Sequence, residues 1–548
     1  MSQLPTRETL TVEFKSDRKC LPDRDLIEAV VGMANAQGGD IYLGVEDDGQ
    51  PTGLHVQHRL LEGLAALVAN RTQPPVHVVV MALDVDGVPV ARISVPANPQ
   101  PVATSEGVIK RRRLQANGEP ECVPYLPHEF PARQAHFGLL DVSAQVVAGA
   151  TLDDLDSLER ARLRQFILRH NGDQALLELD DEQLDNALGL TARSGIVRQP
   201  TLTGLLLIGH EAALRRLVPT HEVAFQILEG EEVRHNDFRR EPLLRALEWL
   251  ETAFRPLNTE REFQSGLFRV AIPRLDARTF REAVANAVTH RDYTARGAVY
   301  VRLSRQDMTI SNPGGLVEGV TLGNLLTTEP RPRNPALADA LKRIGLVERT
   351  GRGVDLIYRG QLRYGRHNPD YTASSPHSVV LRLSLAEANE AFLSLVLQEE
   401  ARRGGVLPID SLIMLATLRE QRRATADQLA QWLHKDASRI GASVEPLVEA
   451  GLLQAHGNGR GRSYTLAAGV YRQLGQQAQY TRQAGFDRLQ QAQMIQSFVQ
   501  QHGRITRQDV IDLCRLTPDQ AYKTLKRLCD EKILVKQGDK KAAVYFKA

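Results

Sequence analysis

The first 150 residues combine short apolar runs with one segment of helical spacing. Apolar residues between Asp25 and Ala36 recur at intervals of three and four, which predicts a helix. Asp86-Gly87 is a pair typical of a two-residue β-hairpin turn. Strands are expected at Thr11–Phe14, Asp40–Val45, Val76–Leu83 and Val88–Val95. The pattern therefore predicts an α+β domain over about residues 1–150.

The middle of the chain begins with a polar, helix-forming segment at Leu152–Asn171, which predicts a helical connector over 151–205. An α/β domain is expected to follow over 206–390. Its apolar runs predict strands at Thr201–Ile208 and Glu222–Leu228, helices at Pro242–Phe254 and Arg281–His290, and a hairpin formed by Val299–Leu303 and Met308–Ser311.

The last part of the chain contains the same pattern twice, in units of about 60 residues. Each unit reads as three helices followed by a hairpin, which is the winged-helix arrangement. We expect the first unit within 391–475 and the second within 476–548. Helices are expected at Leu412–Gln421, Thr425–Leu433 and Asp436–Ala450, then at Gln493–Gln501, Thr506–Cys514 and Thr517–Glu531.

Charge distinguishes the two C-terminal units, although the net charge of the whole chain is only +2. Seven of the twelve lysines lie in the last 26 residues, and from Gln491 onward eleven Lys and Arg face six Asp and Glu. The first unit is nearly balanced, with seven against six between Leu407 and Val470. We therefore expect the second unit to bind DNA. Its candidate contacts are Lys523, Lys526 and Arg527 on a helix, and Lys536, Lys540 and Lys541 in the wing.

A second basic run, Lys110-Arg111-Arg112-Arg113, lies between turns at Gly107 and Gly118. Guanidinium groups bind phosphates well, so this run is a candidate nucleic-acid edge. The alternative is a solvated run of charge.

Composition limits the functional classes. The four cysteines are far apart and show neither metal-ligand spacing nor a disulfide framework, which fits a reducing cytoplasm. No segment resembles a signal peptide or approaches the roughly 20 apolar residues of a membrane span, so we expect a cytoplasmic protein without membrane contact. The chain contains no Gly-Lys pair, so it lacks the phosphate loop of a helicase motor.

Three N-terminal motifs occur in register: Glu8-x-x-x-x-Glu13-Phe-Lys15, Ala34-Asn35-x-x-Gly-Gly39 and Gly44-Val-x-Asp47-Asp-Gly49. Together they resemble the Schlafen AlbA family, which implies a nucleic-acid-binding domain. In members with nuclease activity, the residues matching Glu8, Glu13 and Asp47 bind a divalent metal, and such carboxylates suit Mg²⁺ or Mn²⁺. The alternative is that the two glutamates are ordinary surface carboxylates and that Asp47 serves only its turn.

Three central motifs follow one another in the order Glu282-x-x-x-Asn286, Asn312-Pro-Gly-Gly315 and Gly351-Arg-Gly353. This order resembles the GHKL ATPases, most closely their RecG-related branch, and implies an α/β sandwich that binds ATP with Mg²⁺. By this resemblance Asn286 would hold Mg²⁺ and Glu282 would polarise the attacking water.

The remaining positions of that site also follow from the resemblance. His290 and Arg291 would lie near the phosphates, and Asn312 would stand where the family has an aspartate for the adenine amino group. The glycines at 314, 315, 351 and 353 would let the backbone approach the ligand, and Arg331–Pro335 would lie where the family has a mobile lid. The alternative is a domain of this shape that has lost its nucleotide.

The sequence thus predicts a multidomain α+β protein: an AlbA domain, a helical connector, a GHKL-like sandwich and two winged helices. Our functional hypothesis is an ATP-responsive DNA-binding protein that regulates transcription, with a homodimer expected by analogy. The first alternative is a Schlafen-type metal-dependent nuclease acting on RNA or single-stranded DNA, for example in phage defence. The second is a protein-interaction scaffold. Whether ATP or nucleic acid is cleaved stays open at this point.

Overall fold

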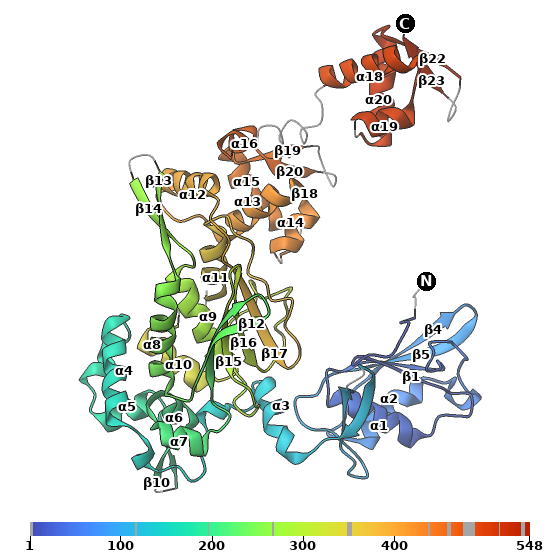
Figure 1. Ribbon diagram of the computed structural model, residues 1–548. Coiled ribbons are helices and arrows are strands. Elements are labelled where there is room, and N and C mark those ends of the chain that lie inside the picture. The colour runs from blue at the N-terminus through green and yellow to red at the C-terminus, as the bar shows by residue number, and fades with distance from the viewer. Residues whose placement is uncertain are drawn as a thin grey trace.

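The protein is a multidomain α/β chain, coloured from blue at its N-terminus to red at its C-terminus in Figure 1. Among the described residues, no helix combines the length and the apolar character needed to cross a bilayer. The computed structural model describes residues 4–115, 118–195, 197–265, 268–347, 353–433, 435–436, 439–456, 462–474, 488–514, 516–538 and 543–547.

The N-terminal region is a four-stranded sheet in the order β1-β2-β5-β4, with β1 parallel to β2 and the other pairs antiparallel. Apolar residues of α1, including Val30 and Met33, pack on Ile41 and Ile93 of the sheet. The predicted helix, strands and hairpin turn of this region are confirmed. The elements are β1 (Val12–Lys15), α1 (Asp23–Ala34), β2 (Gly39–Leu43), α2 (Glu62–Arg71), β4 (Val79–Val85), β5 (Val88–Val95), β7 (Lys110–Leu114) and β8 (Pro120–Pro124).

A helical segment follows and shares one hydrophobic core with the central region, since the same buried cluster extends from Ala150 to Leu385. The helical connector therefore packs as one unit with the central region. The domain boundary that we expected near residue 205 falls inside helix α6. The helices are α3 (Phe130–His136), α4 (Ser157–Arg169), α5 (Asp181–Ala187), α6 (Leu202–Ile208) and α7 (Glu211–Leu217).

The predicted strand at Thr201–Ile208 is wrong, because this segment forms helix α6. All seven residues of α6 are buried, including the polar Thr203, so the helix has no exposed polar face whose spacing could distinguish it from a strand. The side chain of Thr201 caps the helix by accepting a hydrogen bond from the backbone N–H of Gly204 at 3.1 Å.

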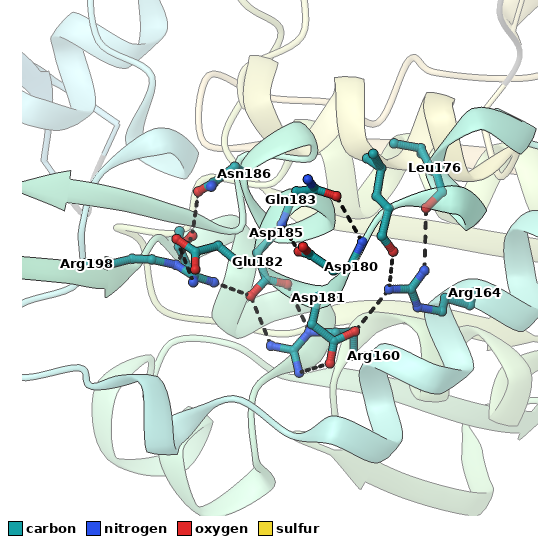
Figure 2. Close-up of polar contacts among 12 residues, drawn as sticks. Arg160, Arg164, Leu176, Asp180, Asp181, Glu182, Gln183, Asp185, Asn186 and Arg198 are labelled. Atoms are coloured by element: carbon teal, nitrogen blue, oxygen red, sulfur yellow. Dashed lines mark hydrogen bonds and ion pairs between the residues drawn. The ribbon is translucent and has the colours of Figure 1, made fainter.

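A buried ion network joins α4, α5 and the strand β10 (Val197–Pro200), as Figure 2 shows. Asp185 is 1 % exposed and accepts two hydrogen bonds from Arg160, at 2.9 and 3.0 Å, and one from Arg198 at 2.8 Å. Asp181, one turn earlier, is exposed and binds Arg164 at 3.0 Å. The carboxylate of Asp185 therefore connects three elements of the connector.

The central region is built on a five-stranded sheet in the order β12-β11-β15-β16-β17. Helices α8, α9 and α10 lie along one side of it in Figure 1 and share its core. The predicted β15–β16 hairpin and the helices at α8 and α9 are confirmed. The elements are β11 (Val223–Glu229), β12 (Glu232–Arg239), α8 (Leu243–Phe254), α9 (Ala277–His290), β15 (Val299–Leu303), β16 (Asp307–Pro313), α10 (Pro335–Ile344), α11 (Gly353–Leu362) and β17 (Ser378–Ser384).

Each C-terminal unit combines helices with a three-stranded sheet, in the orders β18-β20-β19 and β21-β23-β22. The predicted helices are present, while their interpretation as winged helices stays a prediction. The first unit has α12 (Glu390–Arg403), α13 (Ile409–Gln421), β18 (Arg423–Thr425), α14 (Ala426–Leu433), α15 (Ile440–Glu449), β19 (Leu453–His456) and β20 (Ser463–Leu466). The second has α18 (Arg488–His502), β21 (Ile505–Thr506), α19 (Arg507–Cys514), α20 (Pro518–Asp530), β22 (Leu534–Gln537) and β23 (Val544–Lys547).

We predict that Asp185→Ala destabilises the central core, because it leaves the guanidinium groups of Arg160 and Arg198 without their shared anion. Breaking a buried ion pair in this way costs about 3–5 kcal/mol. Asp181→Ala is the matched control, because its exposed pair is worth about 0–1 kcal/mol. Urea unfolding followed by circular dichroism measures both, and equal midpoints for the two variants would contradict the prediction.

Candidate functional site

Helix α9 presents Glu282 and Asn286 one turn apart on one face. Its N-terminus is capped by Asp276, which accepts a hydrogen bond from the N–H of Thr279 at 2.9 Å. Glu282 is buried and Asn286 is half-buried. The first residue of α11, Gly353, lies so close to Glu282 that a Cβ there would overlap the carboxylate. The structure thus places the start of α11 against the carboxylate that the sequence singled out.

Tyr371 also lies near this carboxylate, and Tyr358 lies near Tyr371. Burial raises the pKa of Tyr371, and the neighbouring Tyr358 and the negative charge of Glu282 raise it further. Tyr358 lies on α11, and Tyr371 belongs to the segment that precedes β17. No local motif marks Tyr371, because the fold brings it to α9 from almost ninety residues away in the sequence.

The glycine turn after β16 packs against the protein's own chain. Gly314 has a φ of +92°, which favours glycine, and a Cβ there would lie 2.9 Å from the Cβ of Asp292. A Cβ on Gly315 would lie 2.6 Å from the carbonyl oxygen of Pro376. Close packing within the chain therefore explains why glycine stands at both positions, without any contribution from a ligand. Asn312 is buried beside them and donates to the carbonyl of Pro313 at 3.1 Å.

Arg291 is fully buried and binds backbone carbonyls. Its guanidinium donates to the carbonyls of Asp292 at 2.9 Å and Gly297 at 2.7 Å, and also to those of Thr220 and Ala295. Burial lowers the pKa of this guanidinium. The side chain thus fixes the loop that follows α9, whereas the resemblance placed it near phosphates.

The segment compared with a mobile lid is attached to the C-terminal end of α9. The amide of Asn334 donates to the carbonyls of Thr289 at 2.7 Å and Arg291 at 2.8 Å, and Arg333 donates to that of His290 at 3.2 Å. These two side chains satisfy carbonyls that a helix end leaves without partners. Burial and the charge of Arg333 lower the pKa of His290 to about 4, so its imidazole is neutral at pH 7.

The chemistry around Glu282 and Asn286 fits ATP with Mg²⁺. The side chain of Asn286 makes no hydrogen bond within the described part of the chain, so its amide oxygen is available to a hard cation. The carboxylate of Glu282 is buried and, with such a ligand bound, would be the group to accept a proton from water. Gly353 supplies the N-terminus of α11, whose N–H groups suit an anion. Gly351 lies outside the described residues, and Arg291 does not fit its expected role.

The N-terminal carboxylates meet a cation of the chain itself. Glu13 is 6 % exposed and forms ion pairs with Arg112 and Lys15. Glu8 accepts from the N–H of Phe14 at 2.7 Å, and its other oxygen lies 3.9 Å from Arg112. Asp47 is exposed in its turn, and the described residues contain no group of three His, Cys, Asp or Glu that could hold a metal. The arrangement around Glu13 therefore does not fit a metal centre.

Strand β7 carries the basic run Lys110–Arg113, and each of its four side chains pairs with a carboxylate. Arg112 points inward and is 5 % exposed, while its neighbours lie nearer the surface. The pairs are Lys110 with Glu28, Arg111 with Glu129, Arg112 with Glu13, and Arg113 with Glu121. A phosphate would have to compete with these carboxylates for every cation of the run.

Helix α20 in the second C-terminal unit presents cations differently. Thr517 caps the helix by accepting from the N–H of Gln520 at 3.3 Å. Lys523 and Lys526 are exposed, and neither forms an ion pair with a described residue. Arg527 lies 3.7 Å from Glu531 on the same helix. Lys536 is exposed on β22, whereas Lys540 and Lys541 lie outside the described residues.

Comparison with known protein families identifies three segments. Residues 8–118 match the Schlafen AlbA_2 family, and residues 297–383 match the family described as putative ATP-dependent DNA helicase RecG C-terminal. Residues 132–224 match a domain of unknown function, DUF8451, which spans the junction between connector and sheet. The RecG-type match includes Asn312 and Gly353 but begins only after Glu282 and Asn286 on α9.

Among curated proteins, no match is found. One of the solved structures that match is the DIP2311 protein from Corynebacterium diphtheriae. It is 24 % identical, covers 85 % of this chain and 94 % of its own, and superposes with a TM-score of 0.50. At this identity the likeness concerns the fold alone.

These findings agree on the two principal domains. An AlbA_2 domain indicates a function related to nucleic acids, and a RecG C-terminal type domain indicates an ATPase-like fold. The chain is therefore a multidomain α/β protein that combines a Schlafen AlbA_2 domain with a RecG C-terminal, ATPase-like domain.

Proposed function

We propose that the protein binds DNA through its second C-terminal unit and that ATP–Mg²⁺ beside α9 and α11 adjusts this binding, as in a transcriptional regulator. The observation that carries the proposal is the position of α11. Its first residue, Gly353, lies against Glu282. Its last residue, Leu362, belongs to the buried core of the first C-terminal unit, together with Phe392 and Met414.

Polar contacts strengthen the attachment of α11 to the first C-terminal unit. Arg359 donates to the carbonyl of Leu407 at 2.6 Å, and Arg363 on the segment after α11 pairs with Glu400 at 2.7 Å. A packed interface of this kind moves as a body and does not deform gradually. A ligand that shifts α11 would therefore shift the C-terminal unit as well. A second copy of the chain is the expected protein partner, by analogy with ATPases of this fold.

The contrast between the two basic surfaces favours α20 as the DNA contact. The cations of β7 are neutralised within the chain, whereas Lys523 and Lys526 form no ion pair with a described residue. An exposed helix with free lysines fits the major groove and its flanking phosphates. The local excess of eleven basic over six acidic residues from Gln491 onward supports the same choice.

For the nucleotide, we predict that Asn286→Ala weakens ATP–Mg²⁺ binding at least ~10-fold, about 1.4 kcal/mol, because a ligand of the cation is lost. Isothermal titration calorimetry measures this directly. Glu282→Ala should retain binding and abolish any hydrolysis. Arg281→Ala, which removes a contact with Glu251 of α8, is the control and should bind normally. No heat from the wild type with millimolar ATP–Mg²⁺ would refute the nucleotide site.

For DNA, we predict that Lys523→Ala combined with Lys526→Ala weakens duplex binding and lowers its salt slope by about 0.9 per lost phosphate contact. Fluorescence anisotropy at several salt concentrations gives both quantities. The matched control replaces Lys110 and Arg113, whose charges are paired within the chain, and it should bind as the wild type does. If the control loses affinity while the α20 variant keeps it, the DNA contact lies in the AlbA_2 domain.

A Schlafen-type nuclease is the second candidate, because Glu8 and Glu13 do converge on one cation, Arg112. Since Arg112 and Lys15 already balance the charge of Glu13, we predict no cleavage of labelled tRNA or single-stranded DNA with millimolar Mn²⁺. Denaturing gels follow the substrates, and Glu13→Gln controls for contaminating nuclease. Cleavage by the wild type that disappears in Glu13→Gln would instead establish the nuclease.

A further inference from the structure

The central sheet has one face that its helices do not cover. Along β15, Val299, Val301 and Leu303 are buried in the core shared with the helices. Tyr300 and Arg302, which alternate with them, point to the opposite face and are only partly buried. Figure 1 shows α8, α9 and α10 on the first side of the sheet. The second side is called the outer face below.

The strand register aligns two rows of side chains across the outer face. Residues paired in neighbouring strands lie on the same face, so each row can be followed from β12 to β17. The first row contains Phe238, Ala224, Tyr300, Ser311 and Val380, and the second contains Asn236, Gln226, Arg302, Thr309 and Arg382. An aromatic row thus lies beside a row of amides and guanidinium groups.

Aromatic and cationic groups of the two rows contact one another. Phe238 is 41 % exposed and meets Tyr300 edge to face, with ring centroids 6.0 Å apart at 87°. The guanidinium of Arg302 lies over the Tyr300 ring, 4.2 Å from its centroid. Its Nε donates to Gln226 at 2.8 Å, and the amide of Gln226 donates to Asn236 at 2.8 Å. These contacts hold the guanidinium plane in a fixed orientation.

The arginines of the outer face differ in how far nearby carboxylates offset their charge. Within the described part of the chain, no carboxylate forms an ion pair with Arg302 or Arg382. Two other arginines, one on β12 and one directly after it, do form ion pairs with carboxylates. Arg234 pairs with Glu229 at 2.6 Å, and Arg240 pairs with Glu222 at 3.1 Å. Asp370 pairs through its backbone with Arg382 across the edge of the sheet, and the charge of Arg382 helps to lower the pKa of that carboxyl. Part of the Arg382 charge is therefore offset, whereas Arg302 keeps its charge on the surface.

We propose that the outer face of the central sheet binds single-stranded nucleic acid. Unpaired bases stack on exposed aromatic rings and on guanidinium planes, and phosphates are attracted to the remaining cations. Phe238 and Arg302 provide the two stacking surfaces, Asn236 offers an amide to a base edge, and Arg382 attracts the backbone. The major groove admits a helix or a two-stranded ribbon, and a five-stranded sheet is broader than either. This separates the outer face from the duplex contact proposed on α20.

Fluorescence anisotropy of the full-length protein tests the proposal, with labelled dT20 and U20 as separate probes. We expect Phe238→Ala and Arg302→Ala each to weaken binding of at least one probe about 10-fold, as the loss of one stacked base does. Arg302→Lys should also weaken it, because an ammonium keeps the charge but loses the plane. Arg234→Ala is the control and should bind normally, because Arg234 is an exposed arginine of β12, the strand of Phe238, and is paired with Glu229.

The outcomes separate this site from the other nucleic-acid contact. Duplex binding should stay unchanged in the Phe238 and Arg302 variants, and single-strand binding should survive Lys523→Ala with Lys526→Ala. Tighter binding of U20 than of dT20 would assign the site to RNA through the 2′-hydroxyl, and the reverse order would assign it to DNA. Unchanged affinity of both probes in Phe238→Ala and Arg302→Ala, or no binding by the wild type, would overturn the proposal.

Discussion

The close contact between α9 and α11 is the constraint on which the rest of the structure depends. A Cβ on Gly353 would overlap the carboxylate of Glu282, and a Cβ on Gly360 would overlap the side chain of Thr279. Only glycines allow the two helices to approach so closely, since packed interiors leave no space for an added atom. The contact fixes the start of α11 at the candidate nucleotide site and directs its other end, Leu362, into the first C-terminal unit.

This arrangement gives the three principal parts of the chain distinct roles. The RecG C-terminal type domain supplies the candidate nucleotide site and, on its outer face, a row of aromatic and cationic groups. The C-terminal units add an exposed helix with unpaired lysines. The AlbA_2 domain, in contrast, uses its most prominent charges internally, because Arg112 lies between Glu8 and Glu13.

Local patterns in the sequence were sufficient for elements whose neighbours lie close along the chain. The Asp86-Gly87 hairpin and helix α9 followed from turn chemistry and helical spacing. Thr201–Ile208 was misassigned because complete burial removes the polar alternation. The role of Tyr371 could not be predicted, because its partner Glu282 lies about 90 residues away in the sequence. Arg291 binds nearby carbonyls as well as that of Thr220, about 70 residues away, and no local pattern showed that the fold buries its guanidinium. The basic run Lys110–Arg113 likewise gave no sign that Arg112 is buried, because its partner Glu13 is about 100 residues away in the sequence.

The central claim is that α11 transmits the state of the nucleotide site to the C-terminal units. Amide hydrogen exchange, with and without millimolar ATP–Mg²⁺, measures this most directly because it reports local stability along the chain. The account predicts that ATP–Mg²⁺ slows exchange in 353–362 and also changes it in 390–421, where the first C-terminal unit packs on α11. Slower exchange confined to α9 and α11, with none at 390–421, would contradict it.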